Sequence, residues 1–513
     1  MSDILSEFLV AMRSRRKSGI LLHPTSLPGR CGIGDLGPWA YRFVDFLVDS
    51  AQGVWQILPL GPPGLGNSPY MCYSSMAGNP LLISVERLAD DGLIPHADIQ
   101  EAPVFPSGRV DFEAVRAFKW KLLRKAARTF SERASSHQRR DFDEFCHHRH
   151  AWLDKFSEFA ALKEKNGGTS WTEWQRGLHP DRSEVLTQKF VQFEFSRQWS
   201  ALRHYCRERG IDIIGDLPIF VAHNSDDVWG NPQLFDLDSS GHPRTVAGVP
   251  PDYFSATGQY WGNPLYRWDV MERTGYAWWI ERVRSSFDLV DILRIDHFRA
   301  FEKYWEIPGE SKTAERGRWV DGPGDRFFAA LEQAIGKLPF IAEDLGYITP
   351  EVHAMRDRWG FPGMRVLQFA FGHESADDPF KPYNFIRNCV VYTGTHDNDT
   401  TLGWFTSDGS AHSTRSAEEI RDERRFVLRY LGTDGREIHW DLIRLAMSSV
   451  ADTAVFPMQD VLGLGSEARM NIPASLENNW LWRFEAEQLK PEHTTRLREF
   501  SRTFGRNTPL LRR

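Results

Sequence analysis

Eight short apolar runs, each ending in polar or charged residues, constrain the fold of this chain more than any other feature of its sequence. The runs are rich in β-branched residues and almost unbroken, which is typical of parallel strands covered by helices on both faces. Segments of helical length, such as residues 38–49 and 350–359, lie between several of them. The runs span residues 19–27, 53–60, 211–218, 289–298, 340–346, 364–370, 390–397 and 454–462.

Strands that alternate with helices in this number predict an α/β fold, and specifically a (β/α)8 TIM barrel. The alternative is a doubly wound open sheet, which would usually carry a glycine-rich phosphate-binding turn after an early strand. The sequence has no such turn, so we favour the barrel. At 513 residues the chain is long for one domain, but barrels of this kind often carry insertions. We therefore expect a single catalytic barrel over residues 1–513, with no separate C-terminal β domain.

The uneven spacing of the runs predicts where the insertions lie. Residues 61–208 follow the second run and carry apolar residues at helical spacing, which predicts a mainly helical insertion. Residues 219–288 follow the third run. Within them, residues 246–266 are rich in glycine, proline and aromatic residues without a regular period, which predicts an ordered active-site loop. Residues 299–338 form a smaller insertion after the fourth run.

Charge and cysteine content exclude several classes of protein. The chain has 62 Lys and Arg against 69 Asp and Glu, a net charge of −7, and no strongly basic stretch, which argues against a nucleic-acid partner. No run approaches the ~18 apolar residues of a membrane span, and the N-terminal basic cluster follows the apolar part instead of preceding it as in a signal peptide. The five cysteines are odd in number and widely spaced, which disfavours a disulfide framework or a zinc site. We expect a cytoplasmic protein without a membrane partner.

Acidic residues stand at the ends of several predicted strands, where the active site of a barrel is built. A carboxylate cluster without an obvious set of metal ligands suggests acid–base or nucleophilic chemistry on an acetal, as in glycosidases. The alternative is that each acid caps the helix that follows it, since Asp is a favoured N-cap residue. Convergence of four or more acids favours the catalytic interpretation. These residues are Asp216, Asp296, Glu343, Asp397 and Asp460.

The alternation of side chains along a strand sharpens this prediction at the fourth run. Arg294 and Asp296 are two residues apart and face the same side, whereas Asp291 faces the other. An arginine beside a carboxylate lowers its pKa, which suits a nucleophile. At the fifth run, alternation alone does not choose between Glu343 and Asp344. If Glu343 faces inward, its strand lies ~4.8 Å from that of Asp296, compatible with the ~5–5.5 Å carboxyl separation of a retaining mechanism.

Two weaker patterns suggest a metal. The pair Asp397 and Asp399 could hold a divalent ion for a nucleotide-sugar transferase, but no phosphate-cradling loop accompanies it. His147, His148 and His150 lie in a charged segment with helical character, and a solvent-exposed helix face is the simpler interpretation. We predict neither a metal site nor a cofactor.

Several long motifs resemble those of the 4-alpha-glucanotransferases, or amylomaltases, a family that includes bacterial maltodextrin enzymes and plant disproportionating enzymes. The similarity runs from about residue 19 to residue 483. The motifs are SPYMCYSSMAGNP from Ser68, GDLPIFVAHNSDDVW from Gly215, VAGVPPDYFSATGQYWGNPLYRWD from Val246, RIDHFRAF from Arg294, AEDLGYITPEV from Ala342, VYTGTHDNDTTLGW from Val391 and QDVLGLGSEARMNIP from Gln459.

The resemblance implies transfer of α-1,4-glucan segments between maltooligosaccharides, glucans and glucose, with retention through a covalent glycosyl-enzyme. Matched motif by motif, Asp296 is the nucleophile, Glu343 the general acid/base and Asp397 the residue that stabilises the distorted sugar. A hydrolase uses the same carboxylates, so the resemblance alone selects transfer. A non-catalytic glucan-binding protein is the other alternative, and the intact carboxylate set argues against it.

The same matching assigns residues that contact the substrate. The residues implied for the donor subsites are Ser68, Tyr70, Asp216, Gln259, Trp261, Arg294, His297, His396 and Asn471. The segment that resembles the family's covering loop contains Asp252, Tyr253, Phe254 and Ser255, of which Phe254 is a candidate for excluding water. The sequence departs from many relatives at residues 474–478, where they have a glycine-containing turn. Of the 19 tryptophans, Trp261 is the one matched to sugar, while Trp120 and Trp152 lie on helical apolar stripes that predict core packing.

Overall fold

Eight parallel strands close into a barrel at the centre of the molecule, as the computed structural model shows for residues 16–251, 257–372, 375–409, 416–473 and 475–506. The strands pair in the order β1-β12-β11-β10-β9-β6-β3-β2. They are β1 (Lys17–Leu21), β2 (Val54–Gln56), β3 (Asp212–Leu217), β6 (Ile292–Ile295), β9 (Phe340–Ala342), β10 (Gly363–Val366), β11 (Cys389–Tyr392) and β12 (Thr453–Pro457). The (β/α)8 prediction is confirmed, and the open-sheet alternative is wrong.

Each predicted run coincides with one barrel strand, but the strands are shorter than the runs. The runs continue past the strand ends into the loops that carry Asp296, Glu343 and Asp397. The loops after β9 and β11 begin with buried residues, so apolar character alone did not mark where strand pairing stops.

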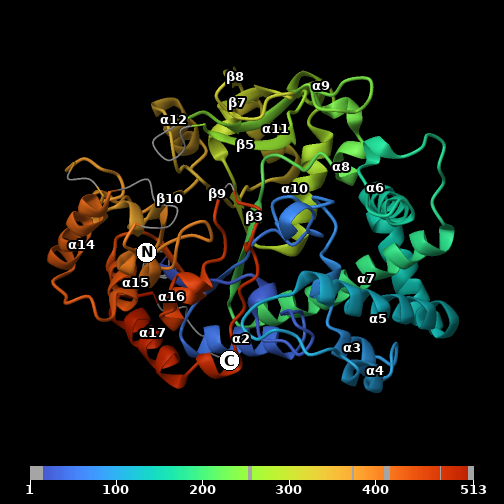
Figure 1. Ribbon diagram of the computed structural model, residues 1–513, viewed down its shortest axis with the longest axis horizontal. Helices are drawn as coiled ribbons and strands as arrows, with labels where there is room; N and C mark the ends of the chain where they lie inside the picture. The colour runs from blue at the N-terminus through green and yellow to red at the C-terminus, as the bar shows by residue number, and fades with distance from the viewer. Residues whose placement is uncertain (1–15, 252–256, 373–374, 410–415, 474, 507–513) are drawn as a thin grey trace, which may run out of the picture.

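Helices cover the outside of the barrel (Figure 1). The segment at residues 38–49 is a helix that starts with Pro38 at its first turn and buries Phe43, Val44 and Leu47 against the strands. The covering helices include α2 (Pro38–Asp49), α10 (Ala277–Leu289), α11 (Asp325–Ile335), α12 (Pro350–Arg358), α15 (Ile438–Ser448) and α17 (Pro491–Thr503).

A layer of helices lies beside the barrel between β2 and β3, at the lower and right side of Figure 1. Its helices are α3 (Val85–Asp90), α4 (His96–Gln100), α5 (Phe112–Arg133), α6 (Ser136–Lys165) and α7 (Arg182–Glu208). The long helix α7 packs on α5 and α6 and also on β3, so it joins this layer to the barrel wall. Trp152 is buried in the layer, and Trp120 is partly buried against the core.

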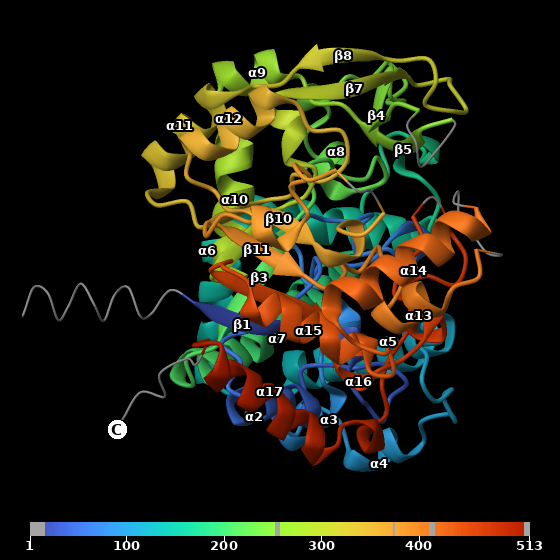
Figure 2. The ribbon, with the colours of Figure 1, turned by 90° about the vertical axis from the view of Figure 1, so that its left-hand side faces the viewer.

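A small antiparallel sheet sits at the top of the barrel in Figure 2. It has the order β5-β4-β7-β8 and consists of β4 (Thr245–Val249), β5 (Gln259–Pro264), β7 (Lys303–Pro308) and β8 (Arg318–Asp321). The prediction of an ordered loop over residues 246–266 is therefore wrong for the residues that lie in β4 and β5. Glycines and a register shift between Val246 and Gly248 interrupt the alternation of side chains, and β4 also pairs with β7, a partner that local sequence does not reveal.

Short helices complete the loops at the carboxyl ends of the strands. They include α8 (Asp226–Trp229), α9 (Trp268–Arg273), α13 (Thr401–Thr406) and α16 (Met458–Leu462), while the longer helix α14 (Ala417–Leu431) lies between β11 and β12. Within the described residues, none of the helices combines the length and the apolar character needed to cross a lipid bilayer.

Candidate active site

Asp296 and Glu343 are brought together by the register of β6 and β9. Ile295 pairs with Ala342, so the next residue of each strand lies at the same level on the barrel. The backbone N–H of Glu343 donates to the carbonyl of Ile295 at 3.1 Å, and the N–H of His297 donates to Glu343 Oε2 at 2.7 Å. The carboxyl of Glu343 therefore lies against the peptide that follows Asp296.

Asp344 points to the opposite side and binds the structure behind the site. Its Oδ1 accepts the N–H of Met364 at 2.7 Å, and its Oδ2 pairs with Arg356 of α12. Alternation along the strand left the choice between Glu343 and Asp344 open, and this pairing shows that Glu343 is the inward residue.

An arginine links two of the strand-end acids. Arg294 Nη1 lies 3.0 Å from Asp296 Oδ1 and donates to both oxygens of Asp216 at 2.7 and 2.8 Å. Asp216 also accepts the hydroxyl of Tyr70 at 2.9 Å. Asp291 faces away and pairs with Arg203 at 3.0 Å, as alternation along the strand predicts.

Asp397 lies after β11 with its carboxyl partly open to solvent, since 45% of the side chain is exposed. Asn471 Nδ2 donates to Asp397 Oδ1 at 2.7 Å, and His396 Nε2 lies 3.4 Å from the same oxygen. Arg469 Nη2 donates to the carbonyl of Asp397 at 2.8 Å. The carboxyl is thus oriented by neighbours while one edge stays accessible to a ligand.

Aromatic rings stand on two sides of these carboxyls. Tyr70 stacks on His396 with a centroid distance of 5.1 Å, and Trp480 lies 5.8 Å from Tyr70. On the other side, Trp261 of β5 contacts His297 edge to face at 4.8 Å, and its Nε1 donates to Gln259 Oε1 at 3.2 Å. Such rings suit the apolar faces of a pyranose.

His297 has a backbone conformation that non-glycine residues rarely adopt. Its φ is 51°, in the left-handed region, and this turn directs its N–H at Glu343. Burial lowers the pKa of His297 to about 3, so the ring is neutral at physiological pH. Its Nε2 is buried and has no hydrogen-bond partner among the described residues.

Burial dominates the titration of the two adjacent carboxyls. It raises the pKa of Asp296 to about 8, Arg294 opposes this, and the negative charges of Asp216, Glu343 and Asp397 add to it. Burial also raises the pKa of Glu343 above its usual value, against Arg294 and the N–H groups of Leu345 and His297. The expectation that Arg294 keeps the pKa of Asp296 low is therefore wrong, because desolvation outweighs the single cation. Together the two carboxyls retain a proton at neutral pH.

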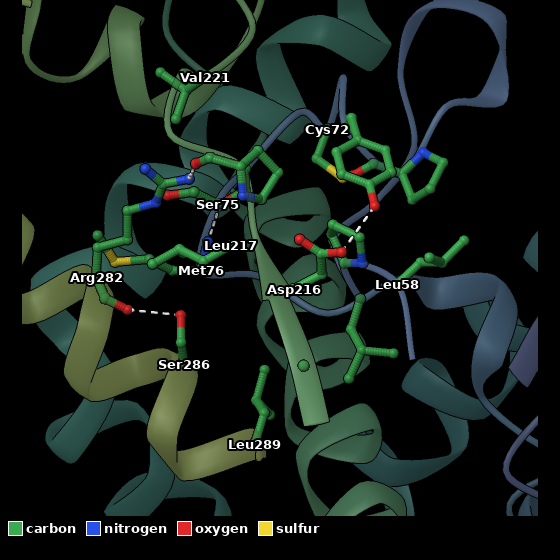
Figure 3. Close-up of a pocket in the computed structure, with 18 of the residues that line it drawn as sticks. Leu58, Cys72, Ser75, Met76, Asp216, Leu217, Val221, Arg282, Ser286 and Leu289 are labelled. Carbon is green, nitrogen blue, oxygen red and sulfur yellow. Dashed lines mark hydrogen bonds between the residues drawn. The ribbon is translucent and has the colours of Figure 1, made fainter. Parts of the chain in front are cut away.

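A small cavity of about 70 Å³ lies behind this site, between β3 and α10 (Figure 3). Asp216 forms one wall, while Arg282 and Ser286 of α10 lie on the other side. Arg282 is buried and donates to the carbonyl of Pro218 at 2.6 Å. The cavity is too small for a sugar chain, and the carboxyls of Asp296, Glu343 and Asp397 do not line it.

The remaining predicted residues fall in different places. The Ser68 hydroxyl accepts the N–H of Tyr70 at 3.2 Å, next to the Tyr70–Asp216 pair. Asp460 does not join the carboxyl cluster, because its side chain is buried and accepts hydrogen bonds from Thr393 and Thr401. The predicted covering-loop residues lie outside the described residues, and they are Asp252, Tyr253, Phe254 and Ser255.

Two residues of the site were missed at the sequence level. Arg469 lies in one of the quoted motifs, but only the fold shows that it binds the carbonyl of Asp397. Trp480 is buried against Tyr70 and His396, and no local pattern distinguishes it from the other tryptophans.

The residues whose patterns suggested a metal site instead bind neighbouring protein groups or are exposed to solvent. The carboxyl of Asp399 accepts the Ser466 hydroxyl at 2.7 Å and the N–H of Thr400 at 2.8 Å. His147, His148 and His150 are exposed on α6. In the part of the chain that the structure describes, no group of three or more His, Cys, Asp or Glu residues could hold a metal ion.

Known proteins with the same organisation are glucan-processing enzymes. A family model described as 4-alpha-glucanotransferase matches residues 22–489. A 4-alpha-glucanotransferase of Synechocystis is 49% identical over 511 residues, covering 96% of this chain and 99% of its own. One from Thermus thermophilus is 48% identical and covers 95% of this chain and 98% of its own. The structure of an amylomaltase from Streptococcus agalactiae in complex with acarbose superposes with a TM-score of 0.89 at 35% identity, over 96% of this chain and 100% of that one.

Proposed function

The chain belongs to the 4-alpha-glucanotransferase family and transfers α-1,4-glucan segments, and we propose that Asp296, Glu343 and Asp397 carry out this reaction as a double displacement with retention. The observation that carries this assignment is the position of Asp296 and Glu343 at matching levels of neighbouring strands, joined through the N–H of His297. Neighbouring parallel strands are ~4.8 Å apart, close to the ~5–5.5 Å between the carboxyl groups of retaining enzymes.

In the first half of the reaction, Glu343 donates its proton to the glycosidic oxygen while a carboxylate oxygen of Asp296 attacks the anomeric carbon. The bond from that carbon to the glycosidic oxygen breaks, the reducing-end fragment leaves with a new 4-hydroxyl, and a glycosyl ester of Asp296 forms. The proton retained by the carboxyl pair supplies the acid for this step.

In the second half, Glu343 acts as a base. It takes the proton of the 4-hydroxyl of an acceptor glucan or glucose, whose oxygen attacks the anomeric carbon and displaces Asp296. One α-1,4 bond is broken and one is formed, and both carboxyls return to their starting states. The proton that Glu343 gives to the leaving group is restored by the acceptor hydroxyl, and the acceptor oxygen supplies the electron pair of the new bond.

Asp397 and its neighbours hold the sugar at the reacting centre. The accessible edge of Asp397 is placed to bind ring hydroxyls, and Asn471 and His396 fix its orientation. Tyr70 and Trp261 offer ring surfaces on the two sides. The proposed donor subsites are completed by Gln259, Arg294, His297, Ser68 and Asp216. In support of this proposal, a structural relative was solved with acarbose bound.

Incubation with maltotriose tests the assignment of the nucleophile. The wild-type protein is expected to form glucose together with maltooligosaccharides longer than the substrate. Asp296→Ala is expected to lower this activity by at least about 10³-fold, because the covalent intermediate no longer forms, while binding of glucan remains measurable. Turnover by Asp296→Ala at the wild-type rate would refute the assignment, and formation of shorter sugars alone would refute transfer.

We also propose that the whole chain is one catalytic unit that acts in the cytoplasm. The helical layer within residues 61–208 and the small sheet within residues 219–288 and 299–338 are then insertions around a single barrel. Five free cysteines, of which Cys31, Cys206 and Cys389 are buried, fit a reducing compartment. Cell fractionation with the activity as marker tests the location.

A further inference from the structure

A large hollow opens on the surface away from the catalytic carboxyls. Its volume is about 1100 Å³, slightly above the ~300–1,000 Å³ typical of ligand pockets. It is formed by the segment between α6 and α7 and by the segment that leads from α8 to β4. In Figure 1 both α6 and α8 lie at the upper right of the molecule. We call it the distal hollow, since Asp296, Glu343 and Asp397 are not among its lining residues.

Two indole rings are fixed side by side on one wall of the distal hollow. Trp174 and Trp229 both pack on Phe159 of α6, with centroid distances of 5.5 and 5.9 Å. Phe159 is fully buried, and Trp174 Nε1 donates to the carbonyl of Thr169 at 3.3 Å. Both indoles are only half-buried, so part of each ring remains open to a ligand. Rings held in place before binding lose little conformational freedom when a ligand stacks on them.

A third indole, that of Trp171, is held on the adjacent wall. Its Nε1 donates to the carbonyl of His223 at 2.8 Å. Its ring packs directly on the backbone of Gly241, where a Cβ atom would come within 2.4 Å of the ring. Glycine at this position, with a φ of 87°, lets the segment before β4 close against the tryptophan. The backbone contacts of Trp171 therefore fix the position of its ring in this wall.

Polar side chains surround the three rings. Gln175, Arg176 and Gln233 are exposed at the rim. Asp238 is occupied by the backbone of its own turn, accepting the N–H groups of Ser240 at 2.8 Å and His242 at 3.0 Å. Flat apolar surfaces flanked by amide and guanidinium groups match a pyranose, which has an apolar face and a ring of hydroxyls at its edge.

The small sheet connects the distal hollow to the catalytic site. Gln259 and Trp261 of β5 stand beside His297, and the chain then runs from residue 259 to Arg267, which lines the hollow. Eight residues of extended chain span at most roughly 26 Å. A glucan chain long enough to cover this span can occupy both places at once.

We propose that the distal hollow is a second binding site for α-1,4-glucan, which holds a remote part of a long chain through Trp174, Trp229 and the glutamines at the rim. The substrate class comes from the proposed function, but the site takes no part in bond cleavage. It therefore affects the use of long glucans and leaves that of short maltooligosaccharides unchanged.

Kinetics with two substrates of different length test this proposal. Trp174→Ala is expected to raise the KM for amylose, with glucose as acceptor, about five-fold, as the loss of one aromatic contact implies. The KM and kcat for maltotriose disproportionation are expected to stay at wild-type values. Trp120→Ala on α5 is the matched control, because it truncates a half-buried tryptophan outside the hollow.

A second variant keeps the test decisive if Trp174→Ala does not fold. Gln175→Ala combined with Gln233→Ala removes two exposed rim groups and leaves the packing on Phe159 intact. Binding of amylose to each variant is then measured in an Asp296→Ala background by affinity electrophoresis, so the result does not depend on the catalytic assignment. Weaker amylose binding than in the parent supports the site. Unchanged binding and unchanged amylose KM would overturn it, as would equal losses with amylose and maltotriose.

Discussion

At the scale of single residues, the proposed chemistry depends on a proton that the neighbouring carboxyls of Asp296 and Glu343 retain between them. Burial raises the pKa of both Asp296 and Glu343, and the negative charge of Glu343 adds to the rise at Asp296. Arg294 moderates the effect but is itself shared with Asp216, which takes up part of its charge. The pair can therefore present one carboxylate and one acid at neutral pH, which is the state that the first half-reaction needs.

The pH profile of the enzyme follows from this pair. The value of kcat/KM for maltotriose is expected to fall on the alkaline side with a midpoint near the pKa of about 8 of Asp296, because above it the pair loses its last proton. Initial rates between pH 5 and 10 measure this, with circular dichroism at each pH as the control for unfolding. A rate that stays level to pH 10 would contradict the shared proton.

The same shift has a consequence for stability. The pKa of Asp296 in the folded protein, about 8, is higher than that of an unfolded aspartate, so the folded state binds more protons between these values and loses stability as the pH rises through them. Asp296→Asn removes this pH-dependent loss of stability, so the substitution is expected to raise the Tm at pH 8 more than at pH 5. The exposed Asp143 on α6 provides the control Asp143→Asn. An equal effect of Asp296→Asn at both pH values would exclude the linkage.

At the scale of elements, an arginine near the chain end ties together the amino-terminal side of the barrel. Arg506 is fully buried and donates to the carbonyls of Met447 at 2.8 Å, Ala451 at 2.8 Å and Lys17 at 2.9 Å. These hydrogen bonds satisfy buried carbonyl groups at the end of α15 and link that helix to β1. Burial lowers the pKa of Arg506 to about 9, and the surrounding carbonyls accept its hydrogen bonds.

Arg506→Met is expected to lower the free energy of unfolding by about 3 kcal/mol, since several buried carbonyls lose their donor. Chemical denaturation measures the change, and kcat for maltotriose in the folded fraction is expected to remain near the wild-type value. Arg502→Met, an exposed position on α17, is the matched control. Equal unfolding midpoints for the two variants would show that this network contributes nothing.

At the scale of the whole molecule, the small sheet places Gln259 and Trp261, which we propose bind substrate, over the barrel. β4 pairs with both β5 and β7, so the strand that carries Gln259 and Trp261 is fixed to a segment that follows Asp296 in the chain. Figure 2 shows this sheet above the barrel. The barrel carries Asp296 and Glu343, and the sheet carries Trp261, whose ring contacts His297.

Trp261→Ala is expected to lower kcat/KM for maltotriose about ten-fold, because one face of the substrate loses its stacking partner. Trp261→Phe retains a ring and is expected to recover most of this loss. The Tm should change little in either variant, since Trp261 is only partly buried. A large fall in Tm with a proportional loss of activity would instead indicate that Trp261 supports the fold.

The sequence by itself determined the barrel, the eight strands and the set of strand-end acids, because unbroken apolar runs and polar strand ends are local patterns. The resemblance of the motifs to the family added the proposed roles of Asp296, Glu343 and Asp397. Only the tertiary structure decided that Glu343 faces Asp296, that Asp460 stays outside the cluster, and that residues 246–266 hold strands. It also decided the direction of the pKa of Asp296, since burial depends on every element around the site and one neighbouring arginine does not fix it. Pairing between distant strands and desolvation are properties of the packed molecule, and no local stretch of sequence contains them.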